Sequence, residues 1–242
     1  MKFTIIFLML LLINNILISF YCTFAKKAEE YIVRKKSPNY VNNGYSKARR
    51  KYVSGIVFLY VKTYSYLYGW VRYCNILVGF VPSNSLRKLL YKYVFKMKLN
   101  RKTNISGGCE FRSPWNIKLG ACTIQGKCIF DGRSGIVVGD NVVFGSGVHI
   151  WTQQHDLNDS YFDVNENNCG TVVIGDYAWI CSDSSILPKV IVNKGVVLGS
   201  KALATKTLEE YGVYVGIPAQ KIADRNKNLK YQLSGQPHWH FY

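Results

Sequence analysis

Apolar residues recur every six positions in three runs of the C-terminal half, and this period restricts the fold more than any other feature of the sequence. A period of six fits neither the 3.6-residue turn of an α-helix nor the two-residue alternation of a simple strand. It is typical of a β-helix, in which each hexapeptide forms a short strand and a corner, and three hexapeptides complete one coil. The residues at the repeating position are Ile124 and Phe130; Val138, Phe144 and Ile150; and Ile174, Ile180, Ile186, Val192, Leu198 and Ala204.

The main interruption of the repeat follows Ile150, and the period resumes at Ile174. The polar segment DLNDSYFDVNENNCGTVV lies between them and has no hydrophobic period. We therefore predict a loop at residues 156–172 that leaves the coil, with His155 at its root; such loops are often functional. Residues eighteen apart, such as Ile174 and Val192, are expected to stack in successive coils, whereas Val138 is expected to have nothing above it until the coil resumes.

The net positive charge of the chain comes from its N-terminal part. The formal net charge is +17, and residues 1–102 contain 19 Lys and Arg but only two acidic residues, whereas the remainder is balanced. Such an asymmetry fits an anionic membrane surface at least as well as a nucleic acid, and we expect no nucleic-acid partner. The seven cysteines, an odd number without C-x-x-C spacing, favour a reducing compartment without structural disulfides.

Residues 1–25, MKFTIIFLMLLLINNILISFYCTFA, have the length of a membrane-spanning helix. One interpretation is a signal peptide cleaved after Ala25; the other is a retained anchor. Basic residues follow the segment instead of preceding it, which favours an anchor in the cytoplasmic membrane with the rest of the chain facing the cytoplasm.

A basic linker is expected at 26–55 and apolar and basic amphipathic helices at 56–100. Within that range, residues 56–81 form a helix that either packs on its own domain or lies in the membrane interface. The segment at 85–98 is predicted to be a basic amphipathic helix, for which lipid contact is plausible. Its two faces would be Lys88, Lys92 and Lys96 on one side and Leu89, Leu90, Tyr93 and Val94 on the other.

The repeat region resembles the hexapeptide-repeat O-acetyltransferases. The similarity is carried by DGRSGIVVGDNVVFGSGVHIWTQQHD, VVIGDYAWI, SILPKVIV and YVGIPAQKI, and it covers roughly residues 82–233. It is strongest to the sugar acetyltransferases of capsule, colanic-acid and O-antigen synthesis, relatives of galactoside and maltose acetyltransferases. The resemblance implies an all-β, left-handed parallel β-helix at residues 101–223, a C-terminal tail at 224–242, a homotrimer, and acetyl-CoA in a groove between subunits.

His155 is the candidate catalytic residue. A sugar hydroxyl is a poor nucleophile at neutral pH, and one imidazole can take its proton during attack on a thioester and return the proton to the departing thiolate. The resemblance identifies His155 in QQHD as this general base, and no covalent acyl-enzyme is required. Without the resemblance, a histidine that merely caps the loop is an equally good interpretation.

The other candidate site residues follow from the resemblance. Asp131 in FDGR, with Arg133 as a weaker candidate, is expected to bind the acceptor, a sugar or lipid-linked saccharide, although a solvated turn aspartate is the alternative. Asp156 would orient the imidazole or line the acceptor pocket. The candidates for acetyl-CoA are Trp179, for which core packing is an equal account, Ser182 and Ser200 at the pantetheine arm, and Thr205 and Lys206 near the nucleotide.

Two departures from the family pattern keep other functions open. Lys189 and Lys201 stand where the family has corner glycines, and a left-handed lysine costs about 1 kcal/mol. These lysines would suit a non-catalytic scaffold with the same coil, and an amino-sugar N-acetyltransferase or serine acetyltransferase is a further alternative. A zinc hydrolase is disfavoured because His149 and His155 are six apart and therefore on successive faces, so we expect no metal.

Overall fold

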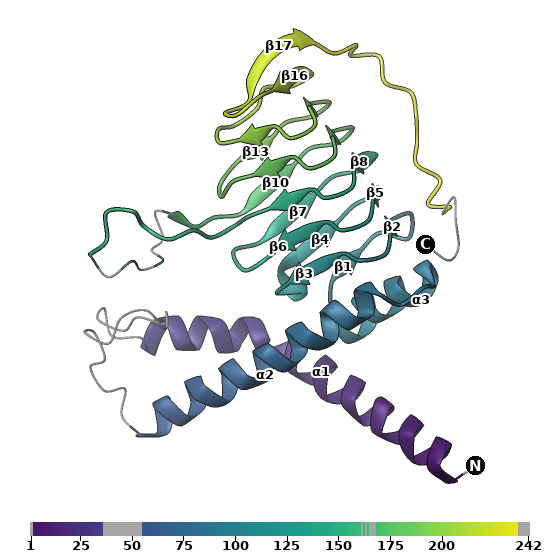
Figure 1. Ribbon diagram of the computed structural model, residues 1–242, viewed down its shortest axis with the longest axis vertical. Coiled ribbons are helices and arrows are strands. Elements are labelled where there is room, and N and C mark those ends of the chain that lie inside the picture. The colour runs from purple at the N-terminus through teal and green to yellow at the C-terminus, as the bar shows by residue number, and fades with distance from the viewer. Residues whose placement is uncertain (1, 36–54, 161, 163, 165–167, 237–242) are drawn as a thin grey trace.

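The computed structural model describes residues 2–35, 55–160, 162, 164 and 168–236. Three parallel sheets, A, B and C, surround one core (Figure 1), which confirms the predicted left-handed β-helix. Sheet A consists of β1 (Lys98–Leu99), β4 (Ile117–Leu119), β7 (Ile136–Val138), β10 (Val172–Ile174) and β13 (Ile191–Val192). Sheet B consists of β2 (Asn104–Ile105), β5 (Cys122–Ile124), β8 (Val142–Phe144), β11 (Trp179–Ile180), β14 (Val197–Leu198), β16 (Gly212–Val215) and the antiparallel β17 (Gln220–Asp224). Sheet C consists of β3 (Glu110–Arg112), β6 (Ile129–Asp131), β9 (His149–Ile150), β12 (Ser185–Ile186) and β15 (Leu203–Ala204).

The residues at the repeating position form the core of the coil. All eleven are buried, with at most 2% of their surface exposed. Ile174 pairs with Val192 in the neighbouring coil, as predicted. Val138 lies directly beneath Ile174, the residue at which the coil was predicted to resume. The loop leaves at a corner and returns to the same corner, and the stack therefore continues past it without a gap.

The corners of the coil use the left-handed backbone conformation throughout. Lys189 and Lys201 adopt it, with φ of 66° and 59°, as their position in place of glycine predicted. Corners in the earlier coils do the same with Lys127 and Asn141. Strain at corners is therefore shared along the whole coil and does not single out the half expected to bind the cofactor.

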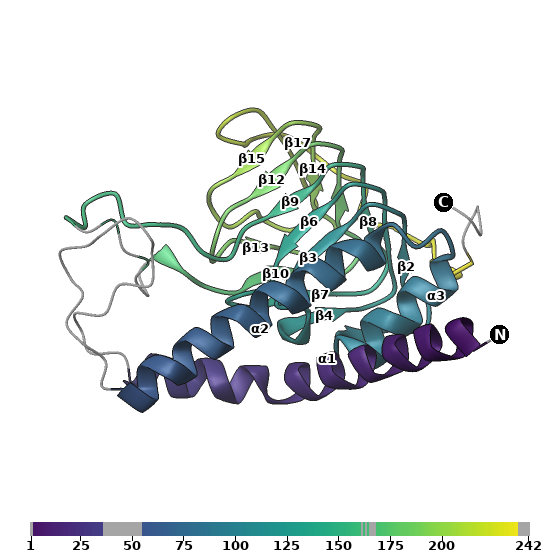
Figure 2. The same cartoon turned by 60° about the horizontal axis from the view of Figure 1, so that its bottom comes forward.

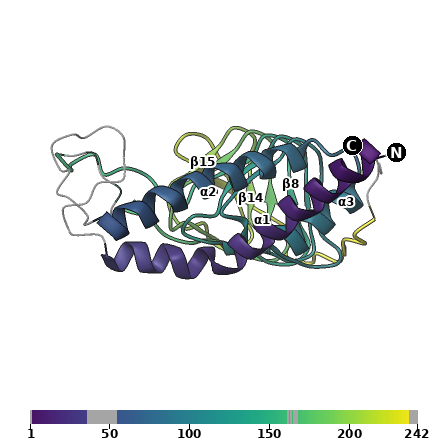
Figure 3. The same ribbon diagram turned by 90° about the horizontal axis from the view of Figure 1, so that it is seen from below.

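Two long helices, α1 (Lys2–Lys35) and α2 (Gly55–Gly79), lie across the base of the coil (Figures 2 and 3). Helix α1 therefore continues through the first ten residues of the expected linker, and residues 36–54 lie outside the described part of the chain. Asn14, which interrupts the apolar stretch, accepts a 2.9 Å hydrogen bond from the indole of Trp70 and so joins the two helices. Residues Thr4–Ala25 of α1 have a mean hydropathy of 2.4 and are long and apolar enough to span a membrane.

A short helix, α3 (Asn84–Leu89), continues into a π-helical turn, η1 (Leu90–Val94), and leads into β1. Ser83 caps α3 by accepting a hydrogen bond from the backbone N–H of Leu86. The predicted apolar face of this segment is only partly correct: Leu90 and Val94 are half-buried, and Val94 packs against the core. Arg87, Tyr91 and Phe95 are buried, whereas Leu89 and Tyr93 are exposed. The burial of Arg87 is tolerated because its guanidinium donates hydrogen bonds to the main-chain carbonyls of Pro82 and Ile105.

The chain after β17 returns along the outside of the coil toward the base (Figure 1). Arg225 donates to the carbonyl of Tyr177, and the hydroxyl of Tyr231 donates to the carbonyl of Asn141. The main-chain N–H of Leu233 donates to the side chain of Asn141. The tail thus contacts several coils, and residues 237–242 of the expected tail lie outside the described residues.

Candidate active site

The predicted loop leaves the coil at the corner between sheets C and A, after β9 and before β10. Its stem is antiparallel: Gln153 pairs with Cys169, and Gly170 donates from its N–H to the carbonyl of Thr152 over 3.0 Å. The 3₁₀ turn η2 (Pro114–Asn116) lies two coils below at the same corner. This stem places His155 just outside the coil.

His155 is half-buried and is held by Phe162 from the far side of the loop. Its ring stacks face to face on the Phe162 ring, with centroids 4.3 Å apart and planes inclined by 5°. Its Nδ1 lies 2.8 Å from the carbonyl oxygen of Phe162. A carbonyl oxygen can only accept a hydrogen bond, so Nδ1 carries the proton, and in the neutral ring Nε2 is left free to accept one. Phe162 was not expected from the sequence; its signal is an aromatic residue within a polar loop.

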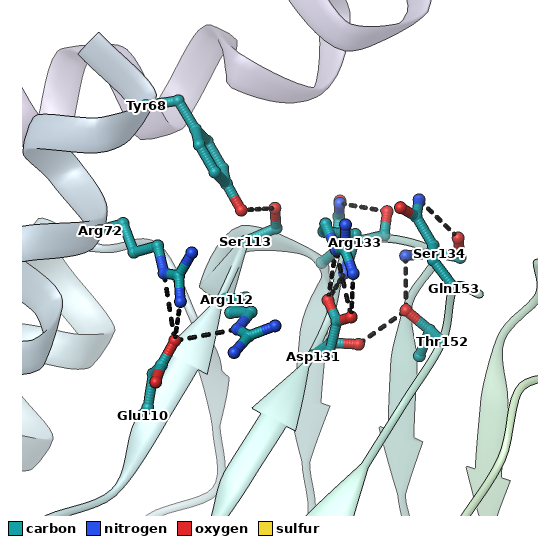
Figure 4. A network of polar contacts seen from close by, with 11 residues as sticks. Tyr68, Arg72, Glu110, Arg112, Ser113, Asp131, Arg133, Ser134, Thr152 and Gln153 are labelled. Carbon is teal, nitrogen blue, oxygen red and sulfur yellow. Dashed lines mark hydrogen bonds and ion pairs between the residues drawn. The ribbon is translucent and has the colours of Figure 1, made fainter. Parts of the chain in front are cut away.

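Asp131 lies at the same corner one coil below and is completely buried. Arg133 forms a bidentate pair with it, with Nε–Oδ1 at 2.8 Å and Nη2–Oδ2 at 2.6 Å (Figure 4). Hydrogen bonding to Asp131 raises the pKa of Arg133 above its usual range, so the guanidinium is charged. The carboxylate is fully engaged within the chain, whereas 37% of the Arg133 side chain is exposed.

Thr152 connects this ion pair to the stem of the loop. Its hydroxyl donates to the carbonyl of Asp131 over 2.6 Å and accepts from the N–H of Ser134 over 2.9 Å (Figure 4). Gln153 donates in turn to the hydroxyl of Ser134. Thr152 therefore fixes the loop stem to the main chain at Asp131 and Ser134. Sequence reasoning missed Thr152 because a buried threonine has no distinctive pattern.

A second polar chain joins helix α2 to the same corner. Glu110 on β3 accepts from Arg72 of α2 over 2.9 Å and from Arg112 over 2.9 Å (Figure 4). Burial would raise the pKa of Glu110, but the hydrogen bonds and charges of Arg112 and Arg72 lower it below its ordinary value of 4.5. The Arg112 guanidinium lies 5.3 Å from the ring centroid of Trp151, which immediately precedes the stem.

The remaining candidates lie along both edges of sheet C. Asp156 follows His155 and accepts a hydrogen bond from the N–H of Asn158, which closes a turn within the loop. Ser182 and Ser200 occupy the edge shared with sheet B, and the N–H of Lys201 donates to the carbonyl of Ser182. Thr205 and Lys206 follow β15 and are exposed at the same edge as His155, two strands farther along sheet C.

Trp179 does not pack in the core, which removes one of its two interpretations. It lies on the outer face of sheet B with 47% of its surface exposed, between the outward-facing Val143 and Val197. Its indole is therefore available to a ligand or to another chain. Within the described residues, no cluster of three or more His, Cys, Asp or Glu side chains could hold a metal ion.

Two curated relatives in sequence are acetyltransferases. Chloramphenicol acetyltransferase from Klebsiella aerogenes is 36% identical over 70 residues, 29% of this chain and 33% of that protein. The putative colanic acid biosynthesis acetyltransferase WcaF from Escherichia coli is 26% identical over 133 residues, 54% of this chain and 71% of that protein. The first match thus spans only a third of its relative's length, and no family model matches the chain.

A solved structure with the same coil is galactoside acetyltransferase in complex with coenzyme A. It is 21% identical, has a TM-score of 0.53, and the match covers 62% of this chain and 78% of that one. This likeness concerns the fold, and together with the sequence relatives it confirms the family resemblance predicted above.

Proposed function

Because this chain is a relative of the hexapeptide-repeat acetyltransferases, we propose that it transfers an acetyl group from acetyl-CoA to a hydroxyl of a sugar acceptor, with His155 as general base. The observation that carries the proposal is the hydrogen bond between Nδ1 of His155 and the Phe162 carbonyl, at the root of the loop that interrupts the repeat. It leaves Nε2 as the proton acceptor, which is what base catalysis requires.

Nε2 of His155 removes the proton as the acceptor oxygen attacks the thioester carbonyl carbon. The tetrahedral intermediate then expels the thiolate, and the imidazolium returns the proton to the thiolate sulfur. The stacked Phe162 ring restricts rotation of the imidazole. The imidazole therefore loses little rotational entropy on reaching the transition state. A hydroxyl is added to the carbonyl carbon and a thiol leaves, and His155 ends the cycle neutral.

We expect Arg133 and Asp156, and not Asp131, to contact the acceptor. The carboxylate of Asp131 is buried and paired with Arg133, so its role is to position the partly exposed guanidinium, while the main-chain carbonyl of Asp131 accepts from Thr152 in the loop stem. The name of WcaF supports a surface polysaccharide precursor as acceptor, and the coenzyme A complex of galactoside acetyltransferase supports acetyl-CoA as donor. Trp179, Ser182, Ser200, Thr205 and Lys206 would contact the donor.

His155→Ala tests the assignment. We expect turnover with acetyl-CoA and an oligosaccharide acceptor to fall at least about a hundredfold, while acetyl-CoA affinity stays near that of the wild type. His149→Ala is the matched control, because His149 lies on sheet C and faces away from the core. Activity of His155→Ala within a few-fold of the wild type would exclude His155 as the base.

A non-catalytic scaffold remains the second candidate, and the same assay separates the two. A scaffold would retain coil and assembly but would not turn over labelled acetyl-CoA with any of a panel of sugar and lipid-linked acceptors. Acetylation of amine acceptors alone would instead indicate an N-acetyltransferase.

We further infer that the base of the coil faces the cytoplasmic membrane from the cytoplasmic side. The apolar residues of α1 between Ile5 and Leu17 are exposed, as are Trp70 and Tyr73 of α2 and Leu89 and Tyr93 near α3. Apolar and aromatic side chains next to lysines suit a membrane interface. The seven cysteines are free thiols, which suits the cytoplasm, where acetyl-CoA is available.

A further inference from the structure

A pocket of about 670 Å³ lies at the base of the coil, away from the corner that carries His155. One wall is the turn η1 and the residues that follow it; the other is the outer side of β1, β4 and β7. Leu99 and Val137 provide apolar surface within it. Its charged lining consists of Lys92, Lys96, Lys98 and Lys118 with Asp140.

The four lysines of this pocket outnumber its one carboxylate, Asp140. Lys98 and Lys118 lie directly beside each other, because β1 and β4 pair in parallel at these positions. Like charges on adjacent strands destabilise a sheet. The carboxylate of Asp140 is engaged by the N–H of Ala121 over 2.6 Å, and none of the four lysines has an ion pair within the described part of the chain. The arrangement costs stability unless an anion occupies the pocket.

The pocket adjoins the apolar helix at the base. The hydroxyl of Ser19 in α1 donates to the carbonyl of Tyr93 in η1, so α1 and the pocket wall are in contact (Figure 2). Tyr93 is itself exposed and lines the pocket. The turn that carries Lys92 is π-helical, a distortion found frequently at functional sites.

We propose that this pocket binds the phosphate group of an anionic lipid. Four lysines from η1, its C-terminal extension, β1 and β4 line one concave surface, which suits a group of multiple negative charge. The apolar surface beside them suits a phosphate attached to a hydrocarbon chain. The same chemistry belongs to a phospholipid headgroup and to a polyprenyl phosphate that carries a saccharide. Binding does not depend on acetyl transfer.

The test compares the full-length protein with Lys98→Gln/Lys118→Gln and with the matched control Lys227→Gln/Lys230→Gln. The control removes the same charge from exposed lysines of the tail. Each protein is floated with vesicles of phosphatidylcholine alone, with added phosphatidylglycerol, and with added polyprenyl phosphate. Binding of inorganic pyrophosphate in detergent is titrated in parallel, which shows whether phosphate is recognised without a lipid.

We expect the pocket variant to bind phosphate-bearing vesicles and pyrophosphate at least about tenfold more weakly than the wild type. The control should bind as the wild type does. In phosphate-free buffer the pocket variant should melt at or above the wild-type temperature, because the like-charge pair is gone. The vesicle bound best identifies the carrier of the phosphate. Equal loss in both variants would show nonspecific attraction and overturn the site, as would unchanged binding in the pocket variant.

Discussion

At the scale of single residues, Asp131 stabilises the fold through its ion pair with Arg133. Asp131→Asn would leave the charged Arg133 without its anion at a buried position and would weaken the corner that carries the stem. We expect the free energy of unfolding to fall by about 2 kcal/mol, less than for a fully buried pair because Arg133 is partly exposed. Urea denaturation measures this loss. Asp183→Asn, an exposed corner residue, is the control and should stay within about 0.5 kcal/mol of the wild type.

The sequence predicted the candidate base but not the residue that orients it. His155 could be proposed because the six-residue period stops beside it and because QQHD resembles the family's catalytic motif; the period alone left a loop-capping histidine equally possible. Phe162 could not be found, because its contact depends on how a loop without period folds back on itself. Asp131 was identified as an acceptor contact, yet its carboxylate is buried and paired, which the sequence does not reveal because the arginine two residues later could equally point to solvent.

At the scale of elements, we expect the attachment of α2 to the first coil to weaken at acidic pH. The lowered pKa of Glu110 means that its stabilising contribution is complete above about pH 4.5 and is lost as pH falls through the folded-state pKa. Glu110→Gln should therefore cost about 1 kcal/mol at neutral pH, since Arg72 is partly exposed, or about 2–4 °C in melting temperature. Melting curves from pH 3 to 7 should show the difference vanish at the acidic end; a constant difference would contradict the ion pair.

The elements themselves were predictable to different degrees. Every strand at the repeating position was expected, because a buried apolar residue at a fixed period is required for the coil to close. The segment after Pro82 was predicted as helix, and its buried face was predicted only in part. Its leucines suggested a conventional apolar stripe, but packing against the first coil buries Tyr91 and Phe95 and brings in Arg87 to satisfy main-chain carbonyls. That choice depends on tertiary contacts.

At the scale of the whole molecule, the outer faces of the coil predict a homotrimer. Ile191 on sheet A and Trp179 on sheet B are exposed apolar residues on two different faces of the prism. Contacts between two different faces of identical chains close into a ring when the rotation between copies allows it, and three copies suit the three faces of the prism. Light scattering should give three times the 27.6 kDa mass of the chain. Ile191→Glu should lower the measured mass of the assembly, because it places a charge on the expected contact face. Ile222→Glu, on the exposed β17, should leave that mass unchanged. A fully active monomer would refute the trimer.

The base of the molecule predicts attachment to the membrane through the first half of α1. Deleting residues 2–13 removes exposed apolar surface but keeps Ile18, Cys22 and Ala25, which are buried against the rest of the protein. We expect the truncated protein to float less with vesicles, to respond more strongly to salt, and to acetylate a soluble acceptor at the wild-type rate. Undiminished flotation of the truncated protein, with the wild type as reference, would show that this half of α1 is not the anchor.

The antiparallel stem at Gln153 and Cys169 separates the loop from the coil. Because the chain re-enters the coil at the corner where it left, the coils above and below pair as if nothing had been inserted. Loop length and composition can therefore vary without disturbing the scaffold, and a loop from another protein could be grafted between the same two stem positions. If the proposed transfer holds, acceptor preference would change with the loop while the rest of the coil stays the same.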